Sequence, residues 1–165
     1  MKLCLLFELA DTVYAADEAD LERVEPLGVV TPAPGAPEEV LGVRLFQGKA
    51  IPIVDLRRRL GLPPKRPEAH SRMLVARVGG RRVGFLIDKV RGLIRTDAGK
   101  IQPLPEGPTG QERQLLKGVL VLDEGPVGIL NPAAAAAPRP AGANSANLQA
   151  ANPLSAKPEL EGVRL

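Results

Sequence analysis

The segment spanning residues 40–62 constrains the fold of this 165-residue chain more than any other part of it. It reads VLGVRLFQGKAIPIVDLRRRLGL: an apolar run, a turn at Gln47 and Gly48, a second apolar run that stops at Asp55, and a basic turn. Two apolar runs around a glycine turn predict a β-hairpin. Pro52 lacks a backbone donor, so the second strand must meet a sheet edge or a bulge there. Both faces of that strand are apolar, which predicts burial on two sides.

Three further pairs of apolar runs surround turn residues elsewhere in the chain. They occupy residues 3–9 and 13–16, 73–78 and 83–90, and 118–122 and 126–130. An acidic stretch at residues 17–25 follows the first pair, and its spacing permits either one helical turn or an irregular strand. Gly and Pro, at 17 each, and the absence of Trp are typical of many short strands and turns rather than long helices. The predicted fold class is therefore all-β.

The hairpins resemble one another in pairs. GVRLFQGKAIPIVD can be laid on GVLVLDEGPVGILN, 76 residues later, and residues 13–17 resemble residues 83–88. This self-similarity predicts two related β subdomains, roughly residues 3–62 and 73–130, within one domain of residues 1–132. The matched stretches are short and apolar, so chance likeness between β-hairpins remains the alternative.

The composition changes after this domain. Residues 133–165 are rich in Ala, Pro, Asn and Ser and have almost no periodic apolar pattern. Such a segment buries too little surface to offset the entropy of ordering it, so a disordered tail is predicted. The five alanines at residues 133–137 allow a helical turn, which Pro132 and Pro138 limit. Residues 160–165 are a possible short docking peptide.

Formal charge is divided along the chain although it sums to only +3. Residues 1–38 hold two basic and eight acidic side chains, a net −6, whereas residues 39–132 hold 17 basic and nine acidic, a net +8. Such a dipolar surface can steer partners over a Debye length of roughly 8 to 10 Å. Ordinary solvated faces are the alternative.

The arginine triplet Arg57, Arg58 and Arg59 is the clearest candidate for contact with nucleic acid, because clustered arginines release phosphate counterions. No aromatic side chain lies near the triplet in the sequence to stack on bases. A solvated basic face, or a surface for an acidic protein partner, is the favoured interpretation. Nucleic-acid binding is not expected, and a β-barrel that binds polyanions remains the alternative from a different functional class.

The inventory of catalytic groups is thin. His70 is the only histidine and lies in a Pro-rich loop, so it lacks the partners of a metal site or a general base. Asp55 and Asp88 each end an apolar strand, where a carboxylate accepts backbone N–H groups. Cys4 lies in an apolar run and is predicted to be a core residue. No enzyme activity, cofactor or metal is therefore expected.

The apolar runs of the sequence do not resemble a signal peptide or a membrane span. The first apolar run ends at Glu8, too early for the central region of a signal peptide. No apolar stretch approaches the roughly 20 residues that span a bilayer. We therefore expect a cytoplasmic protein without membrane insertion.

Four landmarks together resemble the CheW-like family of chemotaxis adaptors. They are LLFELADTVYAAD, PGAPEEVLGVRLFQGKAIPIVDLRRRLGL, VARVGGRRVGFLIDKVRGLI and GVLVLDEGPVGIL, in this order. The resemblance implies two interlocked five-stranded SH3-like barrels without enzymatic activity. It also implies an adaptor that couples a CheA-type histidine kinase to a methyl-accepting chemoreceptor or a divergent input protein.

The resemblance marks candidate binding residues as well. Gly42 matches a glycine at the family's kinase interface, although a β-bulge also favours glycine. At the family's receptor-facing groove, neutral Gln47 replaces an arginine, and Arg23 stands where the family has an acidic residue. Leu21 and Val24 keep an apolar character suited to a receptor helix or to the core.

Two further departures affect the expected partners. Glu18 replaces an aliphatic residue of the groove, and the family's C-terminal apolar helix gives way to alanines and prolines after Asn131. Changed charges alter partner choice, because charge complementarity chiefly sets specificity. An adaptor that binds only one partner, as an insulator or alternative coupler, is therefore the second interpretation within the family.

Overall fold

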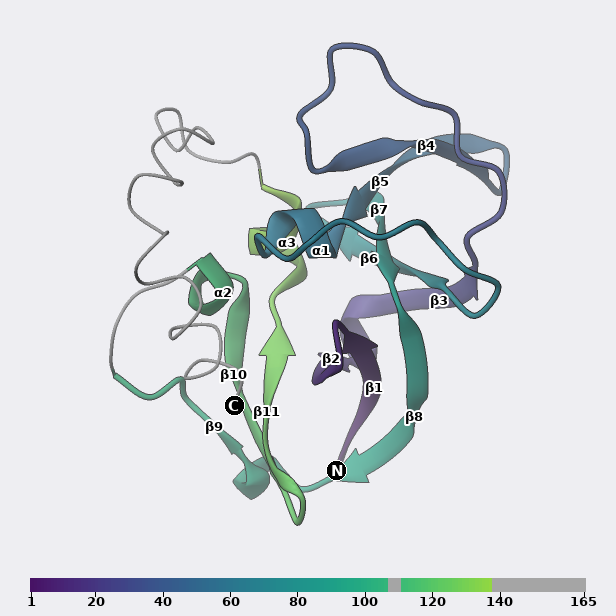
Figure 1. Cartoon of the computed structure of the whole chain (residues 1–165). Helices are drawn as coiled ribbons and strands as arrows, with labels where there is room; N and C mark the ends of the chain where they lie inside the picture. Colours follow the sequence, from purple (N-terminus) through teal and green to yellow (C-terminus); the bar gives the residue numbers. More distant parts are fainter. Residues whose placement is uncertain (107–110, 138–165) are drawn as a thin grey trace.

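The computed structural model describes residues 1–106 and 111–137, and these residues form two β-sheets (Figure 1). The all-β prediction is confirmed. Sheet A contains, in spatial order, β8 (Lys89–Thr96), β1 (Lys2–Leu9), β2 (Thr12–Asp17), β11 (Gly125–Leu130), β10 (Leu116–Leu122) and β9 (Ile101–Gln102). Sheet B contains β3 (Leu21–Pro26), β6 (Arg72–Val78), β7 (Arg81–Ile87), β5 (Lys49–Asp55) and β4 (Val40–Phe46).

Short helices lie between the strands. They are η1 (Glu18–Asp20), α1 (Leu56–Arg59), η2 (Ala98–Lys100), α2 (Gln111–Gln114) and α3 (Pro132–Ala136). The acidic stretch after the first hairpin contains both structures that its spacing allowed, since η1 supplies a helical turn and β3 a strand.

The two sheets repeat one arrangement of strands. In sheet A the antiparallel hairpin β1–β2 pairs through a parallel seam with the hairpin β10–β11. In sheet B the hairpin β6–β7 pairs through a parallel seam with the hairpin β4–β5. The hairpins that resemble each other in sequence therefore occupy equivalent places. The internal repeat reflects a real structural repeat.

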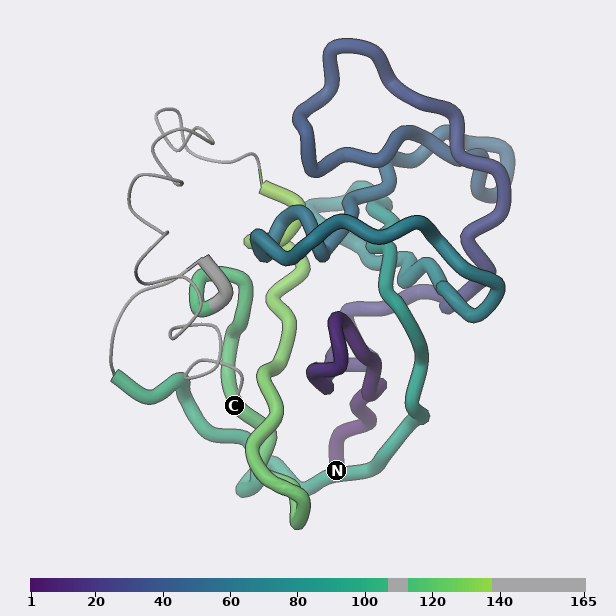
Figure 2. The backbone as a smooth tube through the Cα atoms, viewed as in Figure 1, coloured from purple at the N-terminus to yellow at the C-terminus, as the bar shows by residue number. Residues whose placement is uncertain are grey.

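The strands that follow the first hairpin of each repeat exchange sheets. β3 follows β2 of sheet A but pairs with β6 of sheet B, and β8 follows β7 of sheet B but pairs with β1 of sheet A. Figure 2 shows the chain passing from one lobe to the other along residues 89–96. Each sheet thus takes strands from both predicted subdomains, so residues 3–62 and 73–130 do not coincide with the sheets. A hairpin forms locally, whereas these exchanged pairings are non-local.

One hydrophobic core joins the sheets. The largest buried cluster includes Phe7 and Tyr14 of sheet A together with Leu74 and Phe85 of sheet B. The rings of Phe7 and Tyr14 stack with centroids 5.9 Å apart. Smaller clusters lie within sheet A around Leu120 and within sheet B around Ile53 and Met73. Burial of apolar surface from both sheets makes the exchanged strands one folded unit.

The alanines after Asn131 form α3 instead of ending the fold. Asn131 caps the helix by accepting a hydrogen bond from the Ala134 N–H at 3.3 Å, and Ala135 is buried in the shared core. The folded region therefore continues past the predicted boundary at residue 132. Of the predicted tail, residues 138–165 lie outside the described residues.

β5 is unpaired on one side at Pro52, as the missing N–H of this proline predicted. Pro52 pairs with Val43 of β4, but the seam with β7 begins only at Ile53. Ala50 and Pro52 are exposed, so the prediction of burial on both faces is wrong for this half of the strand. Burial on the second face begins at Val54. The apolar pattern of the sequence could not show that β7 pairs with β5 only from Ile53 onward.

Candidate functional site

A half-buried ionic joint ties the two sheets together. Asp88, the residue after β7, accepts hydrogen bonds from the Ala10 N–H at 2.9 Å and from Arg57 Nη2 at 2.6 Å and Nε at 2.9 Å. Ala10 lies in the β1–β2 turn of sheet A, and Arg57 lies on α1, which follows β5 of sheet B. The carboxylate therefore links a turn of one sheet to a helix of the other. We call these three residues the joint.

Asp55 and Asp88 accept backbone N–H groups, as the sequence predicted, but their environments differ. Asp55 caps α1 through the Arg57 N–H at 3.0 Å, and burial raises the pKa of Asp55. Burial also acts to raise the pKa of Asp88, but hydrogen bonds from Arg57 and Ala10 outweigh it, so that pKa is lowered. The hydrogen bond to Asp88 likewise raises the pKa of Arg57. The joint is thus ionised at neutral pH.

Two of the three arginines of the triplet are structural, so the predicted solvated basic face is wrong for Arg57 and Arg59. Arg57 is held by Asp88, and Arg59 is only 6% exposed and donates to the Ala134 carbonyl of α3 at 3.2 Å. Arg58 lies 3.5 Å from the Asp55 carboxylate and donates to the Glu38 carbonyl, but its side chain is 40% exposed. The triplet therefore does not form one exposed basic face.

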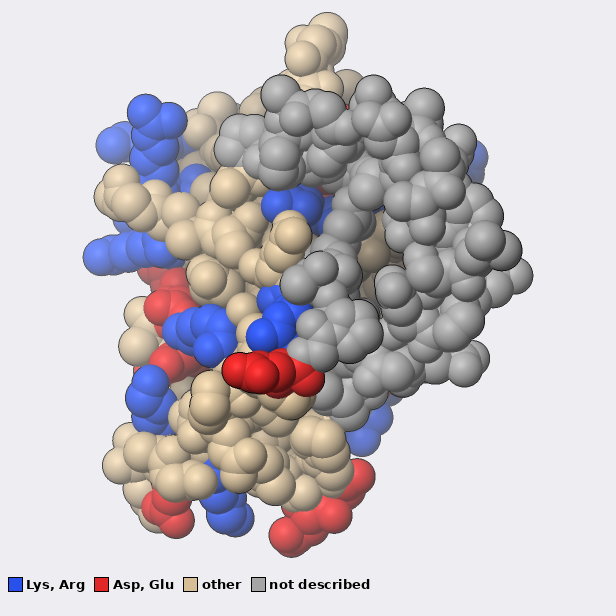
Figure 3. All heavy atoms as spheres, turned by 90° about the vertical axis from the view of Figure 1, so that its left-hand side faces the viewer, with Lys and Arg blue, Asp and Glu red and all other residues tan. Residues whose placement is uncertain are grey.

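Basic and acidic side chains are mixed on the visible part of the face that Figure 3 displays. Lys and Arg predominate in the upper part, and acidic side chains lie among them below.

The predicted receptor-groove residues lie around β3. Glu18 is exposed on η1, and Arg23 is exposed on β3. Leu21 is half-buried and packs against the shared core, whereas Val24 is 39% exposed. Of the two apolar candidates, Val24 is therefore the one whose side chain is exposed to solvent.

The charge change at Arg23 is balanced by neighbours that sequence reasoning did not select. Arg23 lies 3.1 Å from Glu25, and Glu25 also accepts from Arg44 of β4 at 3.0 Å. β3 and β4 are opposite edges of sheet B, so the Glu25–Arg44 pair closes that sheet into a barrel. A carboxylate, that of Glu25, and a guanidinium, that of Arg44, are thus present near the predicted groove, although at other positions than Arg23 and Gln47.

The turn that holds Gln47 lies at the same end of sheet B. Gln47 is exposed with a φ of 50°, and the preceding Phe46 is buried. The guanidinium of Arg82 lies 5.4 Å from the centroid of the Phe46 ring and within 2.7 Å of Glu22 on β3. The hydrogen bond from Arg82 lowers the pKa of Glu22. These contacts connect β3 to the Gln47 turn.

Gly42 is buried under another segment of the chain. A Cβ atom at Gly42 would lie 2.3 Å from the Thr31 carbonyl oxygen, and the pairing of β4 shifts register between Val40 and Gly42. The glycine is therefore required by a bulge and by the segment that crosses it. Of its two interpretations, the structure supports the bulge, and a direct partner contact stays a prediction.

An exposed apolar pair lies on the same edge of sheet B. Thr31 forms an isolated bridge with Val43 of β4, and Val29 and Leu45 each lie two residues from that bridge. Val29 is 84% exposed and Leu45 is 71% exposed. Sequence reasoning missed this pair, although the alternation of Leu45 with buried Phe46 gave a signal for an outward side chain. We call Val29 and Leu45 the edge patch.

The remaining candidates have structural surroundings. His70 is exposed and lies 2.9 Å from Glu68, and Cys4 is buried, which raises the pKa of its thiol. Within residues 1–106 and 111–137, no three His, Cys, Asp or Glu side chains gather as metal ligands would. Over the same residues, every helix is too short or too polar to cross a membrane.

Comparisons with known proteins agree with this architecture. The family model described as the CheW-like domain matches residues 3–137. The "Probable chemotaxis protein CheW" of Rhizobium etli is 32% identical over 120 residues, covering 73% of this chain and 77% of the relative. "Protein FrzA" of Myxococcus xanthus is 29% identical over 110 residues, covering 67% of this chain and 69% of the relative.

A solved structure shows the same fold. The scaffolding protein TtCheW of Thermoanaerobacter tengcongensis superposes with a TM-score of 0.74 at 28% sequence identity. The match covers 79% of this chain and 88% of that protein. The two-sheet architecture is therefore shared with a protein described as a scaffold.

Proposed function

The chain belongs to the CheW-like family of chemotaxis scaffold proteins, and we propose that it couples a CheA-type histidine kinase to a chemoreceptor or a divergent input protein. It acts without catalysis and in the cytoplasm, where such kinases work. Its contribution is geometric, because holding one partner beside another raises the effective concentration of the first near the second.

The edge patch is the observation that carries the proposal. Leu45 on β4, the outer strand of sheet B, and Val29 beside it in the chain segment that crosses β4 are apolar and largely exposed. Exposed apolar side chains favour contact with a protein partner. Because Thr31 already bonds the N–H and C=O of Val43, side chains make this contact and no strand is added at Val43. We assign this surface to the kinase's own CheW-like domain. Gly42 contributes indirectly, by letting the segment around Thr31 approach β4 closely.

The opposite edge of sheet B supplies a second surface. Val24 and Arg23 are exposed on β3, and the Gln47 turn lies at the same end of the sheet through the Glu22–Arg82–Phe46 contacts. We assign this surface to the receptor or input protein. A helix with one apolar side chain for Val24 and a carboxylate for Arg23 fits it best.

The joint holds sheet B, which carries both surfaces, against sheet A. Arg57 and Asp88 fix α1 of sheet B beside the β1–β2 turn of sheet A, and the shared core packs the two sheets together. A scaffold needs such rigidity, because a loose connection would lower the effective concentration that it creates.

Co-purification with a CheA-type kinase tests the proposal. The variant Leu45→Glu places a charge in the edge patch without touching the core, and kinase affinity should fall more than about tenfold, as for an interface anchor. The matched control is Leu93→Glu on β8, where the side chain is 56% exposed on the other sheet. This control should retain binding.

Gly42→Asp is a less direct probe, because its new side chain would collide with Thr31 and disturb the fold. Equal kinase binding by the wild type and Leu45→Glu would contradict the assignment of the edge patch. Failure of the wild type to bind any CheA-type kinase from the same cell would contradict the coupling role.

A further inference from the structure

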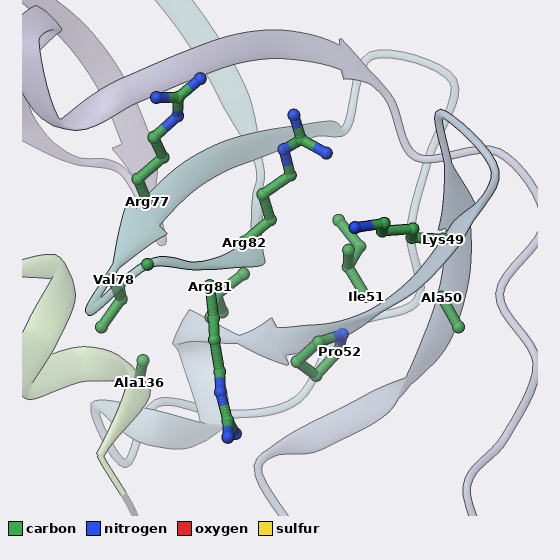
Figure 4. Close-up of a pocket in the computed structure, with 11 residues that line it drawn as sticks. Lys49, Ala50, Ile51, Pro52, Arg77, Val78, Arg81, Arg82 and Ala136 are labelled. Atoms are coloured by element: carbon green, nitrogen blue, oxygen red, sulfur yellow. The ribbon is translucent and has the colours of Figure 1, made fainter.

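A pocket of about 810 Å³ opens at one end of sheet B, beside the β6–β7 turn (Figure 4). Its walls are residues 49–52 of β5 and residues 80–83 around the start of β7, and Ala136 of α3 closes one side. Arg82 is shared with the receptor surface proposed above, where it contacts Glu22 and Phe46. Lys49, Pro52 and Arg81 belong to neither surface, so most of the pocket is still unassigned.

The pocket is open because the seam between β5 and β7 begins late. Its first pair joins Ile53 to Gly84, so the preceding residues of both strands are not paired with each other. Pro52 has no N–H with which to add the previous pair. In the sequence overlay of the two hairpins Gly128 of sheet A corresponds to Pro52, and that glycine pairs with Tyr14. The parallel pairing of sheet A thus includes the position that Pro52 leaves unpaired in sheet B.

The rim of the pocket carries an excess of positive charge. Its four cations are Lys49, Arg77, Arg81 and Arg82. Arg77 and Arg82 share the single carboxylate of Glu22, at 3.4 and 2.7 Å. Lys49 and Arg81 have no ion-pair partner within the part of the chain that the structure describes. The rim therefore retains uncompensated charge.

The cations flank the opening and are partly fixed in place. In Figure 4, Arg77 and Arg82 point to one side of the pocket, and Arg81 points to the other. Arg82 is held by Glu22 and by the Phe46 ring. A guanidinium that is already oriented loses less conformational entropy when it binds a carboxylate.

The lining between the cations is apolar. Ile51 and Val83 are buried in the wall, and Pro52, Val78 and Ala136 add exposed or half-buried carbon surface. No aromatic side chain lines the pocket, so it has no stacking surface for nucleotide bases. A flexible polyphosphate would use the rim but would leave the apolar wall uncovered.

We propose that this pocket binds an acidic segment of a protein partner in which carboxylates alternate with aliphatic side chains. The carboxylates bind the guanidinium groups of Arg81 and Arg82 and the ammonium group of Lys49. An aliphatic side chain covers Ile51 and Pro52. Charge-assisted hydrogen bonds supply the specificity, and the apolar contact removes water from them.

Fluorescence anisotropy with a labelled peptide of alternating Glu and Leu tests the site on the full chain. Arg81→Glu and Lys49→Glu should each weaken binding about tenfold, the change expected for loss of roughly one charge-assisted hydrogen bond. Arg95→Glu, an equal charge change at an exposed position of β8, is the control and should leave the affinity unchanged. A peptide of alternating Gln and Leu should not bind.

Three results would overturn the proposal. Equal weakening by Arg95→Glu would mean that net charge alone attracts the peptide. An oligonucleotide that competes as strongly as the peptide and responds to the same variants would make the site a polyanion site. Residues 159–161 of the chain itself read Glu-Leu-Glu, the same alternation as the peptide. If Glu159→Gln with Glu161→Gln makes the full chain bind the peptide more tightly, this segment and not a partner is the occupant.

Discussion

Two equivalent places in this molecule are built from the same order of strands but are held in different ways. At the first, α1 of sheet B meets the β1–β2 turn of sheet A, and Arg57, Asp88 and Ala10 close the contact with ionic and backbone hydrogen bonds. At the second, α3 after sheet A lies beside the β6–β7 turn of sheet B, and Ala136 lines the pocket there together with Gly80 and Arg81. The first place is the joint, and the second is the open pocket.

The two aspartates at equivalent strand ends explain the difference. Asp88 directly follows β7 and bridges the sheets, whereas Asp17 ends β2 and binds locally to the Ala19 N–H at 3.0 Å and to Lys2 at 2.9 Å. The repeat therefore conserves the backbone plan while its side chains serve separate purposes. One end stabilises the scaffold, and the other end is left available for binding.

The largest expected effect comes from removing the bridging carboxylate. Asp88→Ala leaves Arg57 half-buried without its partner and the Ala10 N–H without an acceptor, so the free energy of unfolding should fall by about 3 kcal/mol. Asp17→Ala removes a local cap and should cost only about 1 kcal/mol. Urea unfolding of both variants measures the difference. Equal losses would mean that the two ends are held alike.

A second test uses pH. Because the folded-state pKa of Asp88 is lowered, its stabilisation is complete above the unfolded value near 3.9 and is lost as pH falls through the lower folded value. The stability difference between wild type and Asp88→Asn should therefore be roughly 1 to 2 kcal/mol at neutral pH and shrink below about pH 4. Urea unfolding at a series of pH values measures it.

Asp55 supplies the opposite case for the same experiment. Burial raises its pKa, so its contribution to stability is complete below the unfolded value and is lost as pH rises through the raised folded value. The difference in unfolding free energy between wild type and Asp55→Asn should therefore shrink as pH rises, whereas that for Asp88→Asn shrinks as pH falls. A difference for Asp88→Asn that does not depend on pH would exclude an ionised joint.

The smallest expected effect concerns the seam that leaves the pocket open. Pro52→Val restores a backbone N–H and a residue suited to strands, so the seam can gain one pair and stability should rise by less than about 1 kcal/mol. The narrowed pocket should then bind the Glu–Leu peptide several-fold more weakly. Peptide anisotropy and urea unfolding measure the two effects. If Pro52→Val raises stability but leaves the peptide affinity unchanged, Pro52 does not determine whether the pocket binds the peptide.

Much of the local structure could be predicted from sequence. Alternating apolar residues and turn glycines predict the hairpins. The prediction that Asp55 and Asp88 accept backbone N–H groups is confirmed. The exchange of β3 and β8 between sheets could not be predicted from the same signals, because it depends on pairings between distant segments. The repeat showed which hairpins are alike but not which strands they pair with.

The surfaces were harder to predict than the fold. Arg59 was expected to be a solvated cation, yet it is buried against α3. For Gly42 the sequence allowed a β-bulge or a partner contact, and the structure shows the bulge and the segment that requires it. The edge patch became visible only when the exposure of Val29 and Leu45 and the bridge from Thr31 to Val43 were known. In each case the deciding neighbour is far away along the chain.

Sedimentation of receptor-containing membranes with a CheA-type kinase tests most directly whether this protein joins two partners through separate surfaces. Wild type should bring the kinase into the pellet, Leu45→Glu should sediment without the kinase, and Val24→Glu should stay in the supernatant with the kinase bound. Recruitment of the kinase to wild-type levels by both variants would contradict coupling through the two edges of sheet B.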